Sequence, residues 1–457
     1  MFSTAPRPLV EPLERPARRG LRVARDWLRR PRLAQFGWVA LGGAAYHLLW
    51  LAVIVLGCWW TLRIAWPFTI DDAGISYAYA KHIALGQGPV AAPGGPRVEG
   101  YSNPLWVLLL VPLQWLGLDL PEFAKVLATL AFAGSLVVGR RYLATLDRQR
   151  FWAWGATDAL FALGLGLCVE FMVWVPAGLE NALFGLALLL LADLDARESS
   201  APSRAGWSGL AACALCLTRP EGVLYAAPLL LIKPALAFRD RAFARQVRSF
   251  LLCWLVPWFS YQVLHYAVFH VWVANTYFAK PGSQTLGKGL HYLWTSLDES
   301  GLRMVVPLAA LGVIGQLRQK LVLLWQCVAG VLFALYAGGD WMPYGRFVAL
   351  FAPSLLLLAA CGVRNLVRGA HRVARGRVPQ EIWALLMSVP LLAAWRSWQE
   401  PSAVKLAKRP WCHFCERVAD MSRLRKIGQA AGLPSVSVLT QDFGGPAWVS
   451  DEHFYPI

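Results

Sequence analysis

Residues 36–72 read FGWVALGGAAYHLLWLAVIVLGCWWTLRIAWPFTIDD, and this stretch decides the fold class. Residues 36–66 carry a single charged side chain, Arg63, and exceed the roughly 20 residues that a helix needs to cross a bilayer. Two neighbouring carboxylates, Asp71 and Asp72, follow the apolar run directly. The stretch therefore predicts a membrane helix with an acidic pair at its exit.

The composition extends this interpretation to the whole chain. Of 457 residues, 57% are hydrophobic and 16% are charged, whereas soluble domains have about 45–50% apolar and about 25% charged residues. So few charges exclude a soluble multi-domain enzyme and a disordered scaffold. Nine cysteines and aperiodic glycines also exclude disulfide-rich and collagen-like chains. The fold class is mainly α, a polytopic helical membrane protein with the lipid bilayer as a partner.

The charge balance indicates orientation in the membrane. There are 44 Lys and Arg against 27 Asp and Glu, a net charge of +17. The basic residues gather in short stretches between apolar runs, as the positive-inside rule describes for cytoplasmic loops. No nucleic-acid-binding motif is present, so no nucleic-acid partner is expected. Residues 1–33 are rich in arginine and are interpreted as a cytoplasmic N-terminal tail.

The short apolar run 104–118 sets the predicted topology. Its fifteen residues are too few to cross the membrane, so it is expected to re-enter or lie in the interface. About eleven spans then follow, with the basic loops inside and the C-terminus outside; a full crossing would move many basic clusters outside. The predicted parts are the tail 1–33, a membrane domain 34–397 with an outer loop 67–103, and a small α/β segment 398–457.

The run from Trp207 to Leu217 is informative about depth. Its eleven residues span about 16 Å, half the thickness of a bilayer core. Arg219 and Glu221 would then lie at membrane depth, which is tolerated in a water-lined cavity or inside protein. One continuous helix over 207–232 is the competing interpretation.

The acidic pair and later outer motifs carry the expected chemistry. Adjacent carboxylates favour a partner cation or a raised pKa, and a carboxylate beside a wet cavity suits a general base. The alternative is that the pair starts a helix. The C-x-x-C of Cys412 and Cys415 predicts a local disulfide, because a thioredoxin-like dithiol lacks its βαβ context and zinc lacks a second pair.

Six motifs resemble the GT-C glycosyltransferases, and most closely their AftB-type arabinofuranosyltransferase group. They occur in the same order along the chain: DDAGISYAYAKHIALGQGPV (71–90), RVEGYSNPLW (97–106), GLENALF (178–184), LTRPEG (217–222), GGDWMPYGRF (338–347) and DFGGPAWVSD (442–451). Proteins of this group often have a bulkier residue where Gly74 stands.

The resemblance implies an enzyme, a hexosyl or pentosyl transferase of a bacterial inner membrane that works on the periplasmic side. It implies a polyprenyl-phosphate sugar as donor, a cell-envelope glycan or lipid as acceptor, and inversion. The base maps to Asp71 or Asp72, with Asp71 preferred. No metal ligands are assigned; a monophosphate leaving group can be held without a metal, and a divalent cation is left open.

Cationic side chains in these motifs are candidates for the donor phosphate. Arg219 and Arg346 come first, since the arginine fork binds two oxygens. The alternatives are a buried ion pair for Arg219 and a snorkelling side chain for Arg346. Secondary phosphate candidates and sugar or acceptor contacts complete the set: Lys81, His82 and Arg97 for phosphate, and Glu99, Glu221, Asp340, Trp341 and Tyr344 for sugar.

Two other functions remain open from sequence: a transporter or flippase of lipid-linked substrates, and an inactive GT-C relative. Transporters carry ionisable groups near the midplane and related broken helices in two halves. Here the charged motifs gather on one predicted face and no internal symmetry is visible, which favours the enzyme.

Overall fold

The computed structural model describes residues 33–147, 153–198, 202–237, 241–273, 285–408, 411–440, 442–451 and 454–456. The chain forms two compact units, Met1–Leu49 and Trp50–Ile457. The predicted N-terminal tail lies outside the described residues apart from Leu33, where helix α2 (Leu33–Ala65) begins. All contacts given below belong to the second unit.

Among the described residues, five helices are long and apolar enough to cross a membrane. Their spans are Gly43–Ala65 in α2, Leu120–Asp147 (α5), Phe243–Phe269 in α12 (Arg241–Phe269), Leu317–Tyr336 (α16) and Arg346–Val373 (α17). Five shorter apolar stretches accompany them: α4 (Pro104–Trp115), α6 (Ala156–Gly166), α9 (Ala205–Thr218), Gly222–Ala235 and α15 (Leu302–Val313). This confirms a mainly α membrane fold, while the count of about eleven crossings stays a prediction.

The other described elements are short or more polar. They are α3 (Ala73–Ala84), α7 (Val169–Met172), α8 (Asn181–Glu198), η1 (Pro202–Arg204), α10 (Gly222–Ala226), α11 (Pro228–Ala237), α14 (Leu286–Glu299), α18 (Gln380–Lys408), α19 (His413–Ala430), β1 (Val436–Val438), α20 (Gly444–Val449) and β2 (Phe454–Pro456). β1 pairs with β2 in parallel.

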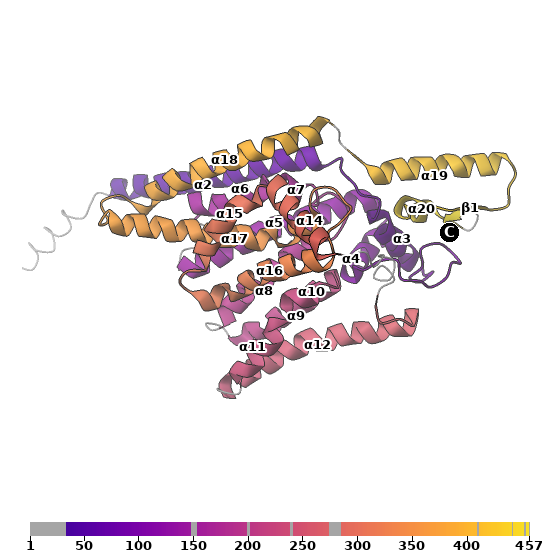
Figure 1. The fold of residues 1–457 in the computed structure, drawn as a ribbon, viewed down its shortest axis with the longest axis horizontal. Helices are drawn as coiled ribbons and strands as arrows, with labels where there is room; N and C mark the ends of the chain where they lie inside the picture. The colour runs from indigo at the N-terminus through magenta and orange to yellow at the C-terminus, as the bar shows by residue number, and fades with distance from the viewer. Residues whose placement is uncertain are drawn as a thin grey trace, which may run out of the picture. The chain divides into compact units, whose positions relative to one another are not determined.

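Helix α17 is the centre of the bundle. Its apolar span is 94% buried, compared with 17–44% for the other four spans. α15 packs directly on α17, and α16, α6 and α8 also contact it (Figure 1). Gly312 and Gly362 bring α15 and α17 together, since a Cβ on either glycine would lie 1.9 Å from a carbonyl oxygen of the other helix. Small residues allow this close packing of membrane helices.

The predicted interruption after residue 218 is confirmed. α9 ends at Thr218, Arg219 is extended, and α10 begins at Gly222. The fourteen residues of α9 span about 21 Å, less than the roughly 30 Å of a hydrocarbon core. The charged break therefore follows a helix too short to cross the core, as the sequence predicted, although α9 is three residues longer than the predicted eleven-residue run.

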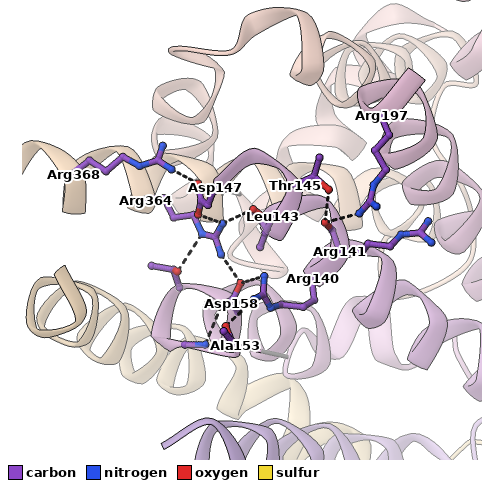
Figure 2. A network of polar contacts seen from close by, with 12 residues as sticks. Arg140, Arg141, Leu143, Thr145, Asp147, Ala153, Asp158, Arg197, Arg364 and Arg368 are labelled. Atoms are coloured by element: carbon purple, nitrogen blue, oxygen red, sulfur yellow. Dashed lines mark hydrogen bonds and ion pairs between the residues drawn. The ribbon is translucent and has the colours of Figure 1, made fainter. Parts of the chain in front are cut away.

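One end of the bundle is held by a network of arginines and aspartates, shown in Figure 2. Arg364 of α17 forms ion pairs with both Asp147 of α5 and Asp158 of α6, and it donates to the Leu143 carbonyl at 2.9 Å. Arg140 lies 3.5 Å from Asp158 and is fully buried. The network fixes α5, α6 and α17 to one another (Figure 2).

The two ends of α17 carry different charged groups. Arg346 is its first residue and Arg364 lies eighteen residues later, a rise of about 27 Å. That separation is close to the thickness of the hydrocarbon core. The Arg346 end and the Arg364 end therefore have the spacing expected of the two faces of a bilayer.

The C-terminal segment does not begin where the sequence predicted. α18 continues through residue 398 to Lys408, so the predicted boundary lies inside a helix. Beyond it, Cys412 and Cys415 form the predicted disulfide next to the start of α19. Thr69 and Cys412 form a parallel bridge that joins this segment to the first outer loop.

Candidate active site

The Asp71 carboxylate is hydrogen-bonded to the C-terminal segment. Its Oδ2 accepts the Gly444 N–H at 2.7 Å and its Oδ1 accepts the Gly445 N–H at 2.8 Å. The side chain is 2% exposed. Burial raises the pKa of Asp71, while the two N–H donors act in the opposite direction. Both carboxylate oxygens therefore serve to fasten α20 to the first outer loop.

Gly74 explains how α20 comes so close. A Cβ at Gly74 would lie 2.5 Å from the Gly444 backbone and 2.7 Å from the Phe414 ring. The bulkier residue that the resembling proteins often have at this position would displace the C-terminal segment. Tyr77 of the next turn also packs edge-on against Phe414 and Trp448.

Asp72 has a different environment from its neighbour. It precedes α3, is half-buried, and its carboxylate makes no hydrogen bond or ion pair with the described residues. Burial raises the pKa of Asp72, Arg346 lowers it, and the carboxylates of Asp71, Asp340 and Glu180 raise it. Of the two predicted base candidates, Asp72 is therefore the one whose carboxylate is not used in a structural hydrogen bond or ion pair with the described residues.

The GGDWMPYGRF motif brings a cation to the same place. Arg346 Nε lies 2.6 Å from Asp340 Oδ2, and its guanidinium stands 6.0 Å from the centre of the Trp174 ring. Gly339 and Gly345 have φ values of +95° and +52°, which lets the loop turn back before α17. Tyr344 is itself left-handed at φ 59°, and its ring packs edge-on against Phe68 near the acidic pair.

A second group of charges completes this region. Arg219 forms 2.5 Å ion pairs with Glu180 and with Glu221. Asn103 donates to the other oxygen of Glu180 at 2.5 Å. Glu180 thus pairs across the fold at the start of α8. Arg219 has the buried acidic partners that the sequence left as its alternative role.

We call Asp72, Glu180, Arg219, Glu221, Asp340 and Arg346 the outer polar cluster. Its four carboxylates and two guanidinium groups have a formal charge of −2. The cluster unites four segments that are far apart in the sequence. A negative surplus stabilises positive charge that develops on a bound molecule. In the described part of the chain no three metal-ligating side chains gather into a metal site.

An open groove adjoins the cluster. One part, of about 540 Å³, is lined by Asp340, the loop to Gly345 and residues of α14. A second part, of about 1030 Å³, is lined by Trp398, Trp411, Lys405 and Glu170 among others. Both parts share Trp341 and Tyr344, and Trp341 is 66% exposed. The groove combines aromatic faces with carboxylates and two lysines, Lys405 and Lys288, a lining that suits sugars.

The other three residues predicted to bind phosphate are not part of the outer polar cluster. Lys81 donates to the Trp448 carbonyl at 3.2 Å and stands 5.2 Å from the centre of that ring. His82 is fully buried, with Nδ1 2.8 Å from the Val90 carbonyl oxygen. Arg97 is exposed. Of the cationic candidates, Arg346 is the one with a single acidic partner inside the cluster.

Sequence reasoning did not find Glu170 in α7. It is 5% exposed, accepts from Ser402 Oγ at 3.0 Å, and lines the larger part of the groove. Burial raises the pKa of Glu170 to about 7. Its one local signal is a carboxylate within the apolar run 159–175, which is unusual at membrane depth.

Comparison with known proteins rests on structure. No family model matches this chain, and no curated protein matches its sequence. Two solved structures match, both of ArnT from Cupriavidus metallidurans: one is bound to undecaprenyl phosphate, with 15% identity and a TM-score of 0.53, and the other is the apo state, with 14% identity and a TM-score of 0.56. Each match covers 92% of this chain and 86% of ArnT.

ArnT is a GT-C glycosyltransferase. This chain shares the fold of ArnT. The match confirms the predicted membrane architecture, and at this level of identity it is a similarity of fold alone. The similarity of fold does not distinguish the AftB-type subgroup, which the motifs resemble, from other groups.

Proposed function

We propose that this protein is a membrane glycosyltransferase, which moves a sugar from a polyprenyl-phosphate donor to an acceptor hydroxyl with Asp72 as general base. The observation that carries the proposal is the unoccupied Asp72 carboxylate inside the outer polar cluster. The ArnT-like fold and the undecaprenyl phosphate bound to one of the two ArnT structures support the donor class. The AftB-like motifs favour arabinofuranose as the sugar and a cell-envelope glycan or lipid as acceptor.

The reaction is one in-line displacement at the anomeric carbon. The acceptor O–H gives its proton to Asp72 while its oxygen forms the new bond to that carbon. The bond to the phosphate oxygen breaks, and the polyprenyl phosphate leaves with the electron pair. Inversion follows because the attacking and leaving oxygens lie on opposite sides of the sugar.

The charges of the cluster support this chemistry. The transition state has oxocarbenium character, so the formal −2 of the cluster stabilises it. Arg346 is the cation we assign to the leaving phosphate, because its planar fork can keep Asp340 and bind phosphate oxygens as well. Arg219, held by two carboxylates, is assigned to positioning Glu180 and Glu221.

The decisive experiment compares the two neighbouring aspartates. Asp72→Asn is expected to slow sugar transfer by about 10²–10⁴-fold, the usual contribution of a general base. The measurement is transfer from a polyprenyl-phosphate arabinofuranose donor in membranes, with Asp71→Asn assayed in parallel. Full activity of Asp72→Asn would overturn the assignment. Flux of lipid-linked sugar across liposomes by the purified protein, without transfer, would favour a flippase.

The pH dependence tests the same residue. Because burial raises the pKa of Asp72, activity should fall with decreasing pH at a pH above the ordinary aspartate value of 3.8. Arg346→Gln removes the cation that lowers this pKa, so it should move the acidic limb to higher pH and slow transfer. An acidic limb unchanged in Arg346→Gln would contradict the electrostatic link between the two residues.

A further inference from the structure

A second cavity, of about 220 Å³, lies between the first outer loop and α12. Its lining includes Glu99 and Ser102 of the loop, Pro104 at the start of α4, Pro220 of the break between α9 and α10, and Val223 of α10. None of these residues lines the groove at Trp341. The cavity is therefore a separate site that the proposed mechanism does not use.

The wall on α12 is a regular stripe. Trp258, Tyr261, Gln262 and His265 follow one another at intervals of three, one and three residues, which places them on one face of the helix. They belong to a segment apolar enough to span the membrane. An ionisable side chain in such a segment indicates a functional site when its partner can be named.

The partner of His265 is Glu99. His265 Nε2 lies 2.7 Å from Glu99 Oε2, and the Tyr261 hydroxyl donates to Glu99 Oε1 at 3.4 Å. Glu99 is 3% exposed and His265 is 5% exposed. The pair fixes the position of a carboxylate at the wall of the cavity.

Three polar groups of the cavity have hydrogen-bonding capacity to spare. Of these, His265 Nδ1 is buried without a partner among the described residues, while the half-buried Ser102 and Gln262 side chains make no hydrogen bond to a described residue. Buried polar groups in proteins are almost always paired with protein, water or ligand. The unpaired groups point to a ligand with several donors and acceptors.

The lining selects a class of ligand. Trp258 and Trp272 offer aromatic faces, and the polar groups offer a carboxylate, an amide and a hydroxyl. A phosphate is disfavoured because Glu99 would repel it and, among the described residues, neither lysine nor arginine lines the cavity. A lipid chain would leave the polar groups unpaired. A neutral ring rich in hydroxyl groups satisfies both kinds of surface.

The same chain segments form the walls of both sites. Pro220 separates Arg219 from Glu221 of the outer polar cluster, and Ser102 and Pro104 flank Asn103, which donates to Glu180. We infer that the Glu99–His265 cavity binds a sugar ring of the acceptor and so delivers it next to the outer polar cluster. The assignment of the bound sugar to the acceptor rests on the proposed function, whereas sugar binding itself is argued from the cavity alone.

Binding can be measured without catalysis. Methyl α-D-arabinofuranoside and methyl α-D-mannopyranoside serve as probes, with saturation-transfer NMR on the purified full chain in detergent micelles. The double variant Ser102→Val with Gln262→Leu leaves the Glu99–His265 pair intact and should weaken binding by about tenfold. Gln429→Leu, the same change at an exposed position of α19, is the matched control and should bind as wild type.

The outcomes separate this inference from the proposed function. Asp72→Asn should lose transfer and keep glycoside binding, since Asp72 does not line the cavity. Absence of saturable binding by the wild type, or binding unchanged in the double variant, would overturn the sugar site. Loss of glycoside binding with an unchanged KM for the acceptor in transfer would overturn the acceptor assignment and leave Asp72 as base untouched.

Discussion

The outer polar cluster and the arginine network of Figure 2 use the same residue types in opposite ways. In the network, Asp147 and Asp158 each pair with two arginines, and Asp193 pairs with Arg141 and Arg197. In the cluster, acids outnumber cations and Asp72 has no partner among the described residues. The ion pairs of the network hold helices together, whereas one carboxylate of the cluster stays available for chemistry.

The largest expected effect contrasts the two regions directly. Arg364→Gln leaves two buried aspartates without their shared cation, so it should lower the free energy of unfolding by about 3–5 kcal/mol. Asp72→Asn should change it by less than about 0.5 kcal/mol. Denaturation of the purified protein in detergent measures both. Equal destabilisation by the two substitutions would remove the distinction between the regions.

Glu170 should give the next largest effect, as a dependence on pH. Its pKa is raised to about 7, so the stability that it contributes is full below its ordinary pKa of 4.5 and is lost as pH rises through 7. Glu170→Gln should therefore gain roughly 3 kcal/mol relative to wild type between pH 4.5 and pH 8. Thermal unfolding across this range checks the sign, with the exposed Glu381→Gln of α18 as control. A constant difference at all pH values would contradict the prediction.

Gly444→Ala tests the attachment of the C-terminal segment. The new Cβ would lie 1.7 Å from the Asp71 carbonyl oxygen, so the two N–H bonds to the Asp71 carboxylate must break or shift. We expect a loss of about 2 kcal/mol and slower transfer, because Asp72 follows directly in the chain. Gly369→Ala is the matched control, since its Cβ meets no atom within 4 Å. Wild-type transfer by Gly444→Ala would show that the attachment does not position Asp72.

Arg368→Gln should show the smallest effect within the network. Arg368 pairs with Asp147 but its side chain is 40% exposed, whereas that of Arg364 is 7% exposed. Solvent screens such a pair, and its loss should cost less than about 1 kcal/mol. The same denaturation experiment measures it. A loss as large as that of Arg364→Gln would mean that the network acts as one unit.

Patterns with a local physical cause were predicted from sequence. Apolar runs between basic loops predicted the membrane fold, the short run before Arg219 predicted the broken helix, and the C-x-x-C spacing predicted the disulfide. The motifs also pointed to the members of the outer polar cluster other than Glu180, because each motif combines charges with glycine or proline; Glu180 lies in one of these motifs but was not a candidate site residue. This reasoning missed Glu170 because a single acidic residue in an apolar run has no second polar residue at a telling spacing.

The sequence by itself determined that two aspartates follow the first apolar helix, that charges recur in a few motifs with glycine or proline, and that the chain is a membrane protein, since hydropathy and charge act residue by residue. Only the tertiary structure decided that Asp71 binds Gly444 and Gly445 while Asp72 stays available. These partners are more than 370 residues apart in the chain. A choice between neighbouring carboxylates depends on which backbone N–H groups the fold brings to them, and adjacent residues of the same type give no sign of it.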